Sequence, residues 1–218
     1  MEKKVDKLLE NIGERLRYLS SVGVEFVSTP SKEPVCSSLT ERILGCQKCP
    51  LSRGRTQAVP GEGNIKTELM FVGEAPGRDE DVQGRPFVGK AGQLLTKIIE
   101  AMHFKREDVY ITNVVKCRPP ENRTPHREEV DACRSYLEEQ LEMIKPKVVV
   151  ALGKVAADFF IESRAGMSSL RGNFYPYGAI QVMPTFHPSY LVRNEGNKIL
   201  KRMVWDDMKK VMAYLGKE

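Results

Sequence analysis

The sequence has no apolar run long enough to cross a bilayer, and its charged first residues lack the apolar core of a signal peptide. It also contains no internal repeat and no low-complexity tract. Without a targeting or membrane segment, the chain is expected to be a soluble cytoplasmic protein whose thiols stay reduced. A Cys-x-x-Cys element in that compartment indicates a metal site more often than a structural disulfide.

The composition is that of an ordinary globular protein. Hydrophobic residues make up 41% and charged residues 29% of the 218 positions, which allows one buried core and excludes extensive disorder. The formal net charge is +5 and the isoelectric point is near 8.9. This mild basic excess suits a polyanionic partner, and it equally suits a solvated surface.

The chain divides into an N-terminal appendage and a main domain. Apolar residues recur at three- and four-residue steps through residues 1–22, which predicts an amphipathic helix. Residues 24–39 are rich in Ser, Thr and Pro and indicate a linker, after which Ser38 or Thr40 caps a short helix. We therefore expect an N-terminal helix and linker over residues 1–37 and a domain over residues 38–218.

Strand-like and helix-like segments alternate through this domain. The expected strands are residues 69–72, 109–112, 148–151 and 180–183, and the expected helices are residues 91–103, 125–144, 154–161 and 197–215. This alternation predicts an α/β fold with a central parallel sheet covered on both faces. Ligands of such sheets bind beyond the carboxyl ends of the strands, so the loops 73–92, 113–124 and 185–194 are the candidate site.

Four cysteines indicate a metal centre. Cys46 and Cys49 form a Cys-x-x-Cys element, and Cys117 and Cys133 follow far downstream. Four thiolates hold either an iron-sulfur cluster or zinc, and the residues alone do not separate the two. Cys133 alone could equally be a small core residue of a helix. The fifth cysteine, Cys36, lies in the linker and is interpreted as a spare thiol, with an alternative metal ligand as the second interpretation.

The first strand-end loop carries two glycine-rich segments. Residues 73–77 (Gly-Glu-Ala-Pro-Gly) allow the backbone to approach a ligand closely, and no Walker-type Gly-Lys-Ser follows them. The charged residues 78–81 (Arg-Asp-Glu-Asp) taken alone indicate a solvated turn. In residues 84–89, Phe87 is a candidate stacking platform for a planar ligand, although a core contact is the commoner role.

The other two loops supply polar groups. Asn113 ends the second strand with an amide that suits the edge of a nucleobase, or that simply closes the strand. The basic, proline-stiffened residues 116–125, which include Arg118 and Arg123, suit phosphates. His187 follows the fourth strand, where a neutral imidazole can donate a hydrogen bond to developing negative charge.

Together these segments resemble the type-4 uracil-DNA glycosylases, the iron-sulfur branch of that superfamily. The resemblance spans residues 38–215 and rests on residues 73–77, 84–89, 112–113, 116–120 and 187–189 and on the cysteine spacing. It implies a three-layer α/β/α fold with a central four-stranded parallel sheet. It also implies excision of uracil from DNA, with a structural 4Fe-4S cluster on Cys46, Cys49, Cys117 and Cys133.

The resemblance also implies roles for individual residues. Glu74 and Ala75 lie against the uracil and the attacking water, and Phe87 stacks on the base. Asn113 reads the polar edge of the base, His187 faces O2, and Glu80 takes part in catalysis. Ala75 stands where related enzymes often carry a water-activating Asp or Asn, so general-base catalysis from that position is in doubt.

Further expectations concern DNA and partners. Leu191 is a candidate wedge for the vacated base stack, and Arg193, Arg118 and Arg123 are candidate phosphate contacts. We expect a monomeric, nucleoid-associated protein that touches a repair or replication protein through its N-terminal helix. Two alternatives remain: a non-enzymatic iron-sulfur module that binds DNA, and a metal-dependent phosphoryl-transfer site on Asp79, Glu80 and Asp81.

Overall fold

The computed structural model describes residues 35–217, with side chains described from Leu39 onward. The expected helix over residues 1–22, most of the linker and the side chain of Cys36 lie outside the described residues. The first described element, α2 (Val35–Leu44), begins inside the segment expected to be linker. It is helical there because Leu39 and Ile43 are buried in the core on the α5 side. The boundary between residues 37 and 38 stays a prediction.

The sheet is larger than predicted, but its centre is as expected. Its order is β1-β3-β2-β4-β6-β5, and the four central strands are parallel to one another. The edge strands β1 and β5 pair antiparallel and were not predicted, because they are too short to show a strand pattern. The strands are β1 (Glu62–Gly63), β2 (Leu69–Gly73), β3 (Tyr110–Asn113), β4 (Val148–Leu152), β5 (Tyr175–Tyr177) and β6 (Ile180–Thr185).

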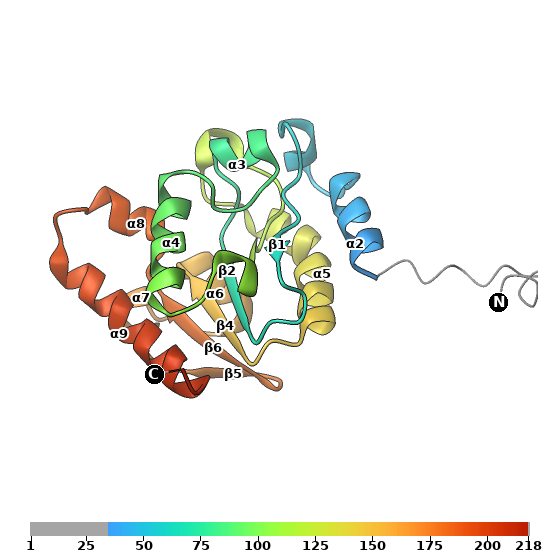
Figure 1. Ribbon diagram of the computed structural model, residues 1–218. Helices are drawn as coiled ribbons and strands as arrows, with labels where there is room; N and C mark the ends of the chain where they lie inside the picture. The colour runs from blue at the N-terminus through green and yellow to red at the C-terminus, as the bar shows by residue number, and fades with distance from the viewer. Residues whose placement is uncertain (1–34, 218) are drawn as a thin grey trace, which may run out of the picture. The chain divides into compact units, whose positions relative to one another are not determined.

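Helices cover both faces of the sheet (Figure 1). On one face, Met70, Val72 and Val149 belong to a core with α2, α5 (Arg127–Ile144) and α6 (Lys154–Phe160). On the other, Phe71 and Val150 belong to a core with α4 (Lys90–Ala101) and α9 (Lys198–Tyr214). Neighbouring residues of a strand alternate between the two cores, as the strand period requires. The three-layer α/β/α fold is confirmed.

Short helices and turns complete the described chain. These are η1 (Pro50–Arg53), α3 (Arg78–Gln83), η2 (Arg106–Asp108), η3 (Pro120–Asn122), α7 (Met167–Leu170) and α8 (Pro188–Arg193). Within residues 35–217, no helix is long and apolar enough to cross a membrane.

The charged segment 78–81 is the start of helix α3 rather than the solvated turn that its charges indicated. Asp81 is only 3% exposed, and its carboxylate oxygens accept the backbone N–H of Thr56 at 2.9 and 3.0 Å. These bonds tie α3 to the chain that precedes the sheet. The sequence pattern did not reveal them, because the partner is a distant backbone group.

Candidate functional site

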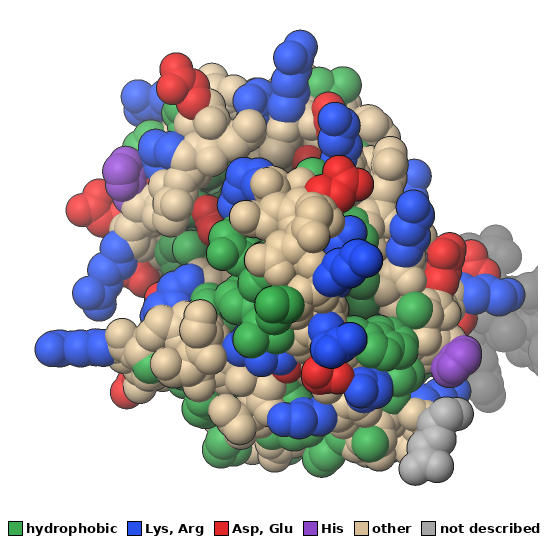
Figure 2. Space-filling model, turned by 90° about the vertical axis from the view of Figure 1, so that its left-hand side faces the viewer, with side chains coloured by type: hydrophobic (Ala, Val, Ile, Leu, Met, Phe, Trp, Pro, Cys, Tyr) green, Lys and Arg blue, Asp and Glu red, His purple; other side chains and the backbone are tan. Residues whose placement is uncertain are grey.

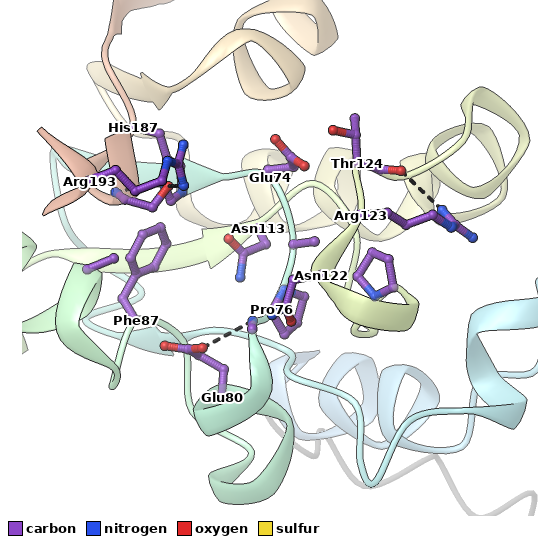
Figure 3. Close-up of a pocket in the computed structure, with 15 residues that line it drawn as sticks. Glu74, Pro76, Glu80, Phe87, Asn113, Asn122, Arg123, Thr124, His187 and Arg193 are labelled. Atoms are coloured by element: carbon purple, nitrogen blue, oxygen red, sulfur yellow. Dashed lines mark hydrogen bonds between the residues drawn. The ribbon is translucent and has the colours of Figure 1, made fainter. Parts of the chain in front are cut away.

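A cavity of about 400 Å³ opens at the carboxyl ends of β2, β3 and β6, where the topology of the sheet predicts a ligand site. All three strand-end loops contribute to it. Figure 3 shows Phe87, His187 and Arg193 on one side, Arg123 and Thr124 on the other, and Asn113 between them. Its lining comprises Glu74, Ala75, Pro76, Gly77, Glu80, Phe87, Ala91, Asn113, Pro119, Asn122, Arg123, Thr124, His187, Ser189 and Arg193.

Asn113 carries an unsatisfied acceptor at this cavity. The residue ends β3 and is 1% exposed, and its side-chain Oδ1 has no hydrogen-bond partner among the described residues. A buried carbonyl oxygen without a donor costs about 1–3 kcal/mol, so the site is complementary to a ligand N–H. The backbone oxygen of Asn113 accepts a hydrogen bond of 2.7 Å from Lys116 Nζ, which holds the end of the strand in place.

His187 is a neutral hydrogen-bond donor by virtue of its local geometry. It is the N-cap of α8, where its Nδ1 accepts the backbone N–H of Ser189 at 3.1 Å. Because a backbone N–H can only donate, Nδ1 carries no proton and the neutral ring carries its proton on Nε2. Burial, together with the charge of Arg193, lowers the pKa of His187 from 6.5 to about 4. The ring nevertheless lines the cavity, where Nε2–H is available to a ligand.

Phe87 presents a flat ring to the cavity from a strained backbone. Its φ of 53° lies in the left-handed region that non-glycine residues seldom occupy, and its side chain is 6% exposed. The ring stacks beside the imidazole of His187, with centroids 5.5 Å apart and planes 30° apart. The preceding carbonyl, of Pro86, accepts a hydrogen bond from Arg106, which helps to fix this turn.

Glu80 joins the two glycine-rich segments. Its Oε1 accepts the backbone N–H groups of Val88 and Gly89, both at 2.9 Å, and its Oε2 accepts the N–H of Gly77 at 3.1 Å. Both carboxylate oxygens are therefore engaged by backbone donors of the segments that flank Phe87 and precede α3. This carboxylate holds the stacking residue in position.

Glu74 and Ala75 lie directly after β2 and line the cavity. The backbone oxygens of Gly73 and Glu74 accept the N–H groups of Val114 and Val115, so this turn is joined to the loop that follows Asn113. Burial raises the pKa of the Glu74 carboxyl, and the charge of Arg193 opposes that rise. The side chain of Ala75 has no polar group and packs against the core.

The basic loop after β3 is less exposed than its sequence indicated. Lys116 is fully buried and donates to Thr112, Asn113 and Gln140 at 2.7 Å each, and burial lowers its pKa to about 7. Arg123 forms a two-pronged ion pair with the carboxylate of Glu129 at 2.7 and 2.8 Å. These two cations stabilise the loop, because their hydrogen-bonding groups are already engaged within the protein.

Arg118 and Arg193 are the more available cations near the cavity. Arg118 is partly exposed and donates to the side chain of Asn122 at 2.8 Å. Arg193 is exposed at the end of α8 and lines the cavity. Leu191, expected as a wedge, is 3% exposed and packs in the core beside α4. It would have to leave this packing to enter a base stack.

The four cysteines of the expected cluster come from three separate segments of the chain. Cys46 follows α2, Cys49 precedes η1, Cys117 follows β3, and Cys133 lies in α5. Cys117 and Cys133 are buried, and Cys46 and Cys49 pack partly buried against the same core. The fold thus brings the Cys46–Cys49 pair and the two downstream cysteines, Cys117 and Cys133, to one region.

Electrostatic coupling shows that these thiols are neighbours. Burial raises the pKa of Cys117, Cys46 and Cys49 raise it further, and a 2.9 Å hydrogen bond from Arg55 opposes the rise. Burial likewise raises the pKa of Cys133 to about 11. Such thiols keep their protons unless a metal displaces them.

Four thiolates can hold either of the two expected metal centres. Among residues 35–217, no three His, Cys, Asp or Glu side chains are close enough to share one ion. Each thiolate of a four-iron cluster binds its own iron, so such a cluster holds its sulfurs farther apart than a single zinc ion does. Four thiols gathered in one region have the chemistry of a thiolate-held metal centre.

Several cavity residues were not identified from the sequence. Asn122 and Thr124 line the cavity from the loop after β3, and Ser189 lines it from α8. Glu121 and Asn122 have φ values of 53° and 55°, so the chain turns sharply there. The sequence signal for this turn was Asn122, because asparagine adopts the left-handed conformation more readily than most residues.

A strand-end cavity with a flat ring, an unsatisfied amide oxygen and a neutral imidazole is complementary to a planar ligand that carries both N–H and carbonyl groups, as a nucleobase does. Comparison with known proteins agrees with this class. Residues 60–209 match the family model described as "Uracil DNA glycosylase superfamily".

Similar proteins narrow the family assignment. The chain is 48% identical to a type-4 uracil-DNA glycosylase of Thermotoga maritima over 86% of this chain and 98% of that protein. It is 44% identical to the type-4 uracil-DNA glycosylase of Archaeoglobus fulgidus over 83% of this chain and 93% of that protein. A type-5 uracil-DNA glycosylase of Pyrobaculum aerophilum is 33% identical over 71% of this chain and 83% of that protein. The chain therefore belongs to the type-4 uracil-DNA glycosylases of this superfamily.

Proposed function

We propose that the protein hydrolyses the N-glycosidic bond of deoxyuridine in DNA, which releases uracil and leaves an abasic site for base excision repair. It is a hydrolase that acts on N-glycosyl bonds. The observation that carries the proposal is the unpaired Oδ1 of Asn113, placed in one cavity with the Phe87 ring and the neutral His187. A target base is out of reach inside a duplex, so it must rotate into this cavity.

Asn113 supplies the selectivity for uracil. Its Oδ1 accepts the N3–H of uracil, and its amide N–H₂ donates to O4. Cytosine presents an acceptor at N3 and a donor at N4, so both hydrogen bonds would fail. Phe87 offers a flat apolar face to the ring. A buried amide that meets the wrong edge is left unpaired, which strengthens the discrimination.

His187 stabilises the leaving group. When the C1′–N1 bond breaks, its electron pair moves onto the uracil ring and positive charge develops on the sugar. The Nε2–H of His187 then donates to O2, where negative charge accumulates, and no proton has to move before the bond breaks. Water adds to C1′ and gives up a proton, which the departing uracil anion takes up by way of solvent, and this completes the hydrolysis.

Negatively charged groups near the sugar stabilise the positive charge that develops on it when the bond breaks. Glu74 lines the cavity, and together with the DNA phosphates it stabilises the cationic sugar and orients the attacking water through the turn at Ala75. Glu80 acts as a positioning residue in this proposal, because three backbone N–H groups occupy its oxygens. It keeps Phe87 in contact with the base.

Cys46, Cys49, Cys117 and Cys133 would hold the 4Fe-4S cluster. The cluster would act structurally, as a covalent connection between α2, the loop after β3 and α5. The chain of contacts from Cys117 through Lys116 to the Asn113 carbonyl would carry this rigidity to the cavity. Arg55, which donates to Cys117, would offset the negative charge of the thiolates.

The two alternatives explain less of the structure. A module that only binds DNA has no need for an unpaired buried amide, a stacked ring and a neutral imidazole in one cavity. In a phosphoryl-transfer site the carboxylates of Glu80 and Asp81 would have to reach a metal, yet backbone N–H groups already engage both of them. Uracil-containing DNA remains the best substrate. A nucleoid location, a monomeric state and a protein contact through residues 1–22 remain predictions.

One assay tests the function. The purified protein is incubated with EDTA and DNA that carries a single uracil, and abasic sites are detected by alkaline cleavage. The same DNA with cytosine or thymine at that position is the control. Excision of uracil alone supports the proposal, whereas intact uracil DNA after prolonged incubation contradicts it. Strand cleavage that EDTA abolishes would indicate the metal nuclease instead.

A further inference from the structure

Helix α8 presents three different surfaces in six residues. Pro188 and Leu191 face the core, where both are buried, while Ser189 and Arg193 line the cavity. At about 100° per residue, Tyr190 points to the outer side, next to the direction shared by Ser189 and Arg193. It is 39% exposed, which is unusual for a large aromatic side chain so close to a binding site.

Tyr190 belongs to a short row of rings beside the cavity. Its ring lies 5.4 Å from that of Phe186 at a 41° tilt, and the guanidinium of Arg171 lies 5.9 Å from the Phe186 ring. Arg171 in turn pairs with the buried carboxylate of Asp207. Phe186 is thereby held between the guanidinium of Arg171 and the ring of Tyr190. The exposed ring of Tyr190 therefore rests on a fixed support.

The surface around this row is apolar at its centre and basic at its edge. Ile199 and Met203 of α9 are 69% and 36% exposed, and Arg171 donates to the backbone oxygen of Met203. Figure 2 looks onto this side of the molecule and shows hydrophobic side chains near the middle of the face, with Lys and Arg side chains around them. Such a surface suits a polyanion that carries flat rings.

We propose that Tyr190 is a stacking platform for the base next to the extruded uracil. The proposal rests on the proposed function. Bases stack on exposed aromatic rings with little dependence on sequence, and nearby cations attract the backbone. Continuity with the cavity identifies the occupant as the same DNA strand, since His187, Ser189 and Arg193 on either side of Tyr190 already line the uracil site.

The platform would take the place of the expected wedge residue. Leu191 is buried in the core, whereas its neighbour Tyr190 is the exposed aromatic side chain of α8. The backbone of α8 is held at this point, because the N–H of Tyr190 donates to the carbonyl of His187 at 2.9 Å. The ring can therefore meet a base without any loss of core packing.

The test measures binding of a single-stranded oligonucleotide that carries an abasic-site analogue, which cannot be cleaved. The full-length protein with its cofactor is used, and affinity is read by fluorescence anisotropy. Stacking of one base on a ring is worth about 1–3 kcal/mol, so Tyr190→Ala should weaken binding by about tenfold to a hundredfold, and Tyr190→Phe should bind like the parent. Binding of free uracil should stay unchanged in both variants.

Tyr214→Ala is the matched control. Tyr214 is 51% exposed and also lies against a phenylalanine, Phe174, with centroids 5.1 Å apart, but it does not line the cavity. It should bind DNA like the parent. A 2-aminopurine placed beside the abasic analogue should be quenched by the parent and by Tyr190→Phe, and less by Tyr190→Ala. Should Tyr190→Ala fail to fold, Tyr190→Leu keeps the apolar area without the aromatic face and should show the same loss.

Three results would overturn the platform. The first is equal DNA binding by Tyr190→Ala and the parent, and the second is an equal loss of DNA affinity in Tyr190→Ala and Tyr214→Ala. The third is a change of oligomeric state in Tyr190→Ala, which would make the surface an interface between two copies. Failure of the proposed function looks different, because the parent itself would then leave uracil in DNA.

Discussion

A Cβ atom on Gly73 would lie 2.4 Å from Oδ1 of Asn113 and 2.5 Å from the ring of Phe87. The two residues proposed to contact the base, Asn113 and Phe87, therefore converge on a position where no side chain fits. Gly73 has an ordinary negative φ, so the requirement for glycine there is one of space rather than of backbone conformation.

Gly73→Ala should accordingly impair base recognition. The added methyl group has to displace either the amide of Asn113 or the ring of Phe87, and a shift of about 1 Å in a positioned group costs about a hundredfold in rate. We expect a loss of that size in kcat/KM on uracil-containing DNA. Gly166→Ala is the control, since a Cβ there meets nothing within 4 Å. Full activity in Gly73→Ala would contradict the crowded geometry.

His187→Ala should lower kcat by about a hundredfold to a thousandfold, because it removes the hydrogen bond to the departing uracil. DNA binding should be retained. Ser189→Ala should have a smaller effect, since the backbone N–H that fixes the tautomer remains. Nitrogen NMR of the parent should place the proton on Nε2. A proton on Nδ1, or unchanged turnover in His187→Ala, would refute this role.

The low pKa of His187 predicts a pH dependence of stability. The unfolded state binds a proton near pH 6.5 and the folded state only near pH 4, so stability is complete above pH 6.5 and falls as the pH drops toward 4. This difference amounts to about 3 kcal/mol at most. Denaturant unfolding of the parent and of His187→Asn, which has no such titration, should diverge by up to that amount between pH 7 and pH 4. Parallel curves would show that the imidazole titrates normally.

Variants of Glu80 should separate positioning from charge. Glu80→Gln keeps one acceptor oxygen, while Glu80→Ala loses all three bonds to Gly77, Val88 and Gly89. For a positioning residue, Glu80→Ala should lose about a hundredfold in kcat/KM and also bind free uracil weakly, with a milder loss in Glu80→Gln. Equal losses of kcat in both variants, with normal uracil binding, would indicate that the negative charge acts on the sugar directly.

Cys133→Ser should lose iron and stability. A cluster between Cys49 and Cys117 closes a long stretch of chain, and loss of a comparable covalent link costs about 2–5 kcal/mol. Iron analysis and thermal unfolding of the purified variant measure both effects. Cys36→Ser is the control and should keep its iron. Iron-free parent protein with unchanged folding would show that the thiols serve only as core residues.

Much of the fold followed from sequence pattern. The β-branched and apolar runs at residues 69–72 and 148–151 form parallel strands as predicted, since short runs of this kind between helical patterns have few other ways to be buried. The edge strand β1 escaped prediction because its two residues owe their conformation to pairing with β3. The start of α2 was also misplaced, because burial against α5 decides it.

For the site, the sequence by itself determined which chemical groups are available: four thiols, the Asn113 amide, the His187 imidazole and the Phe87 ring. The positions of the last three groups in the strand-end loops also placed those groups at one edge of the sheet. Only the tertiary structure decided their states. It removed the proton from Nδ1 of His187, left Oδ1 of Asn113 without a donor, and committed Glu80, Lys116 and Arg123 to internal hydrogen bonds. Protonation, pairing and exposure depend on neighbours that are distant in the chain, so they arise only when the chain is packed.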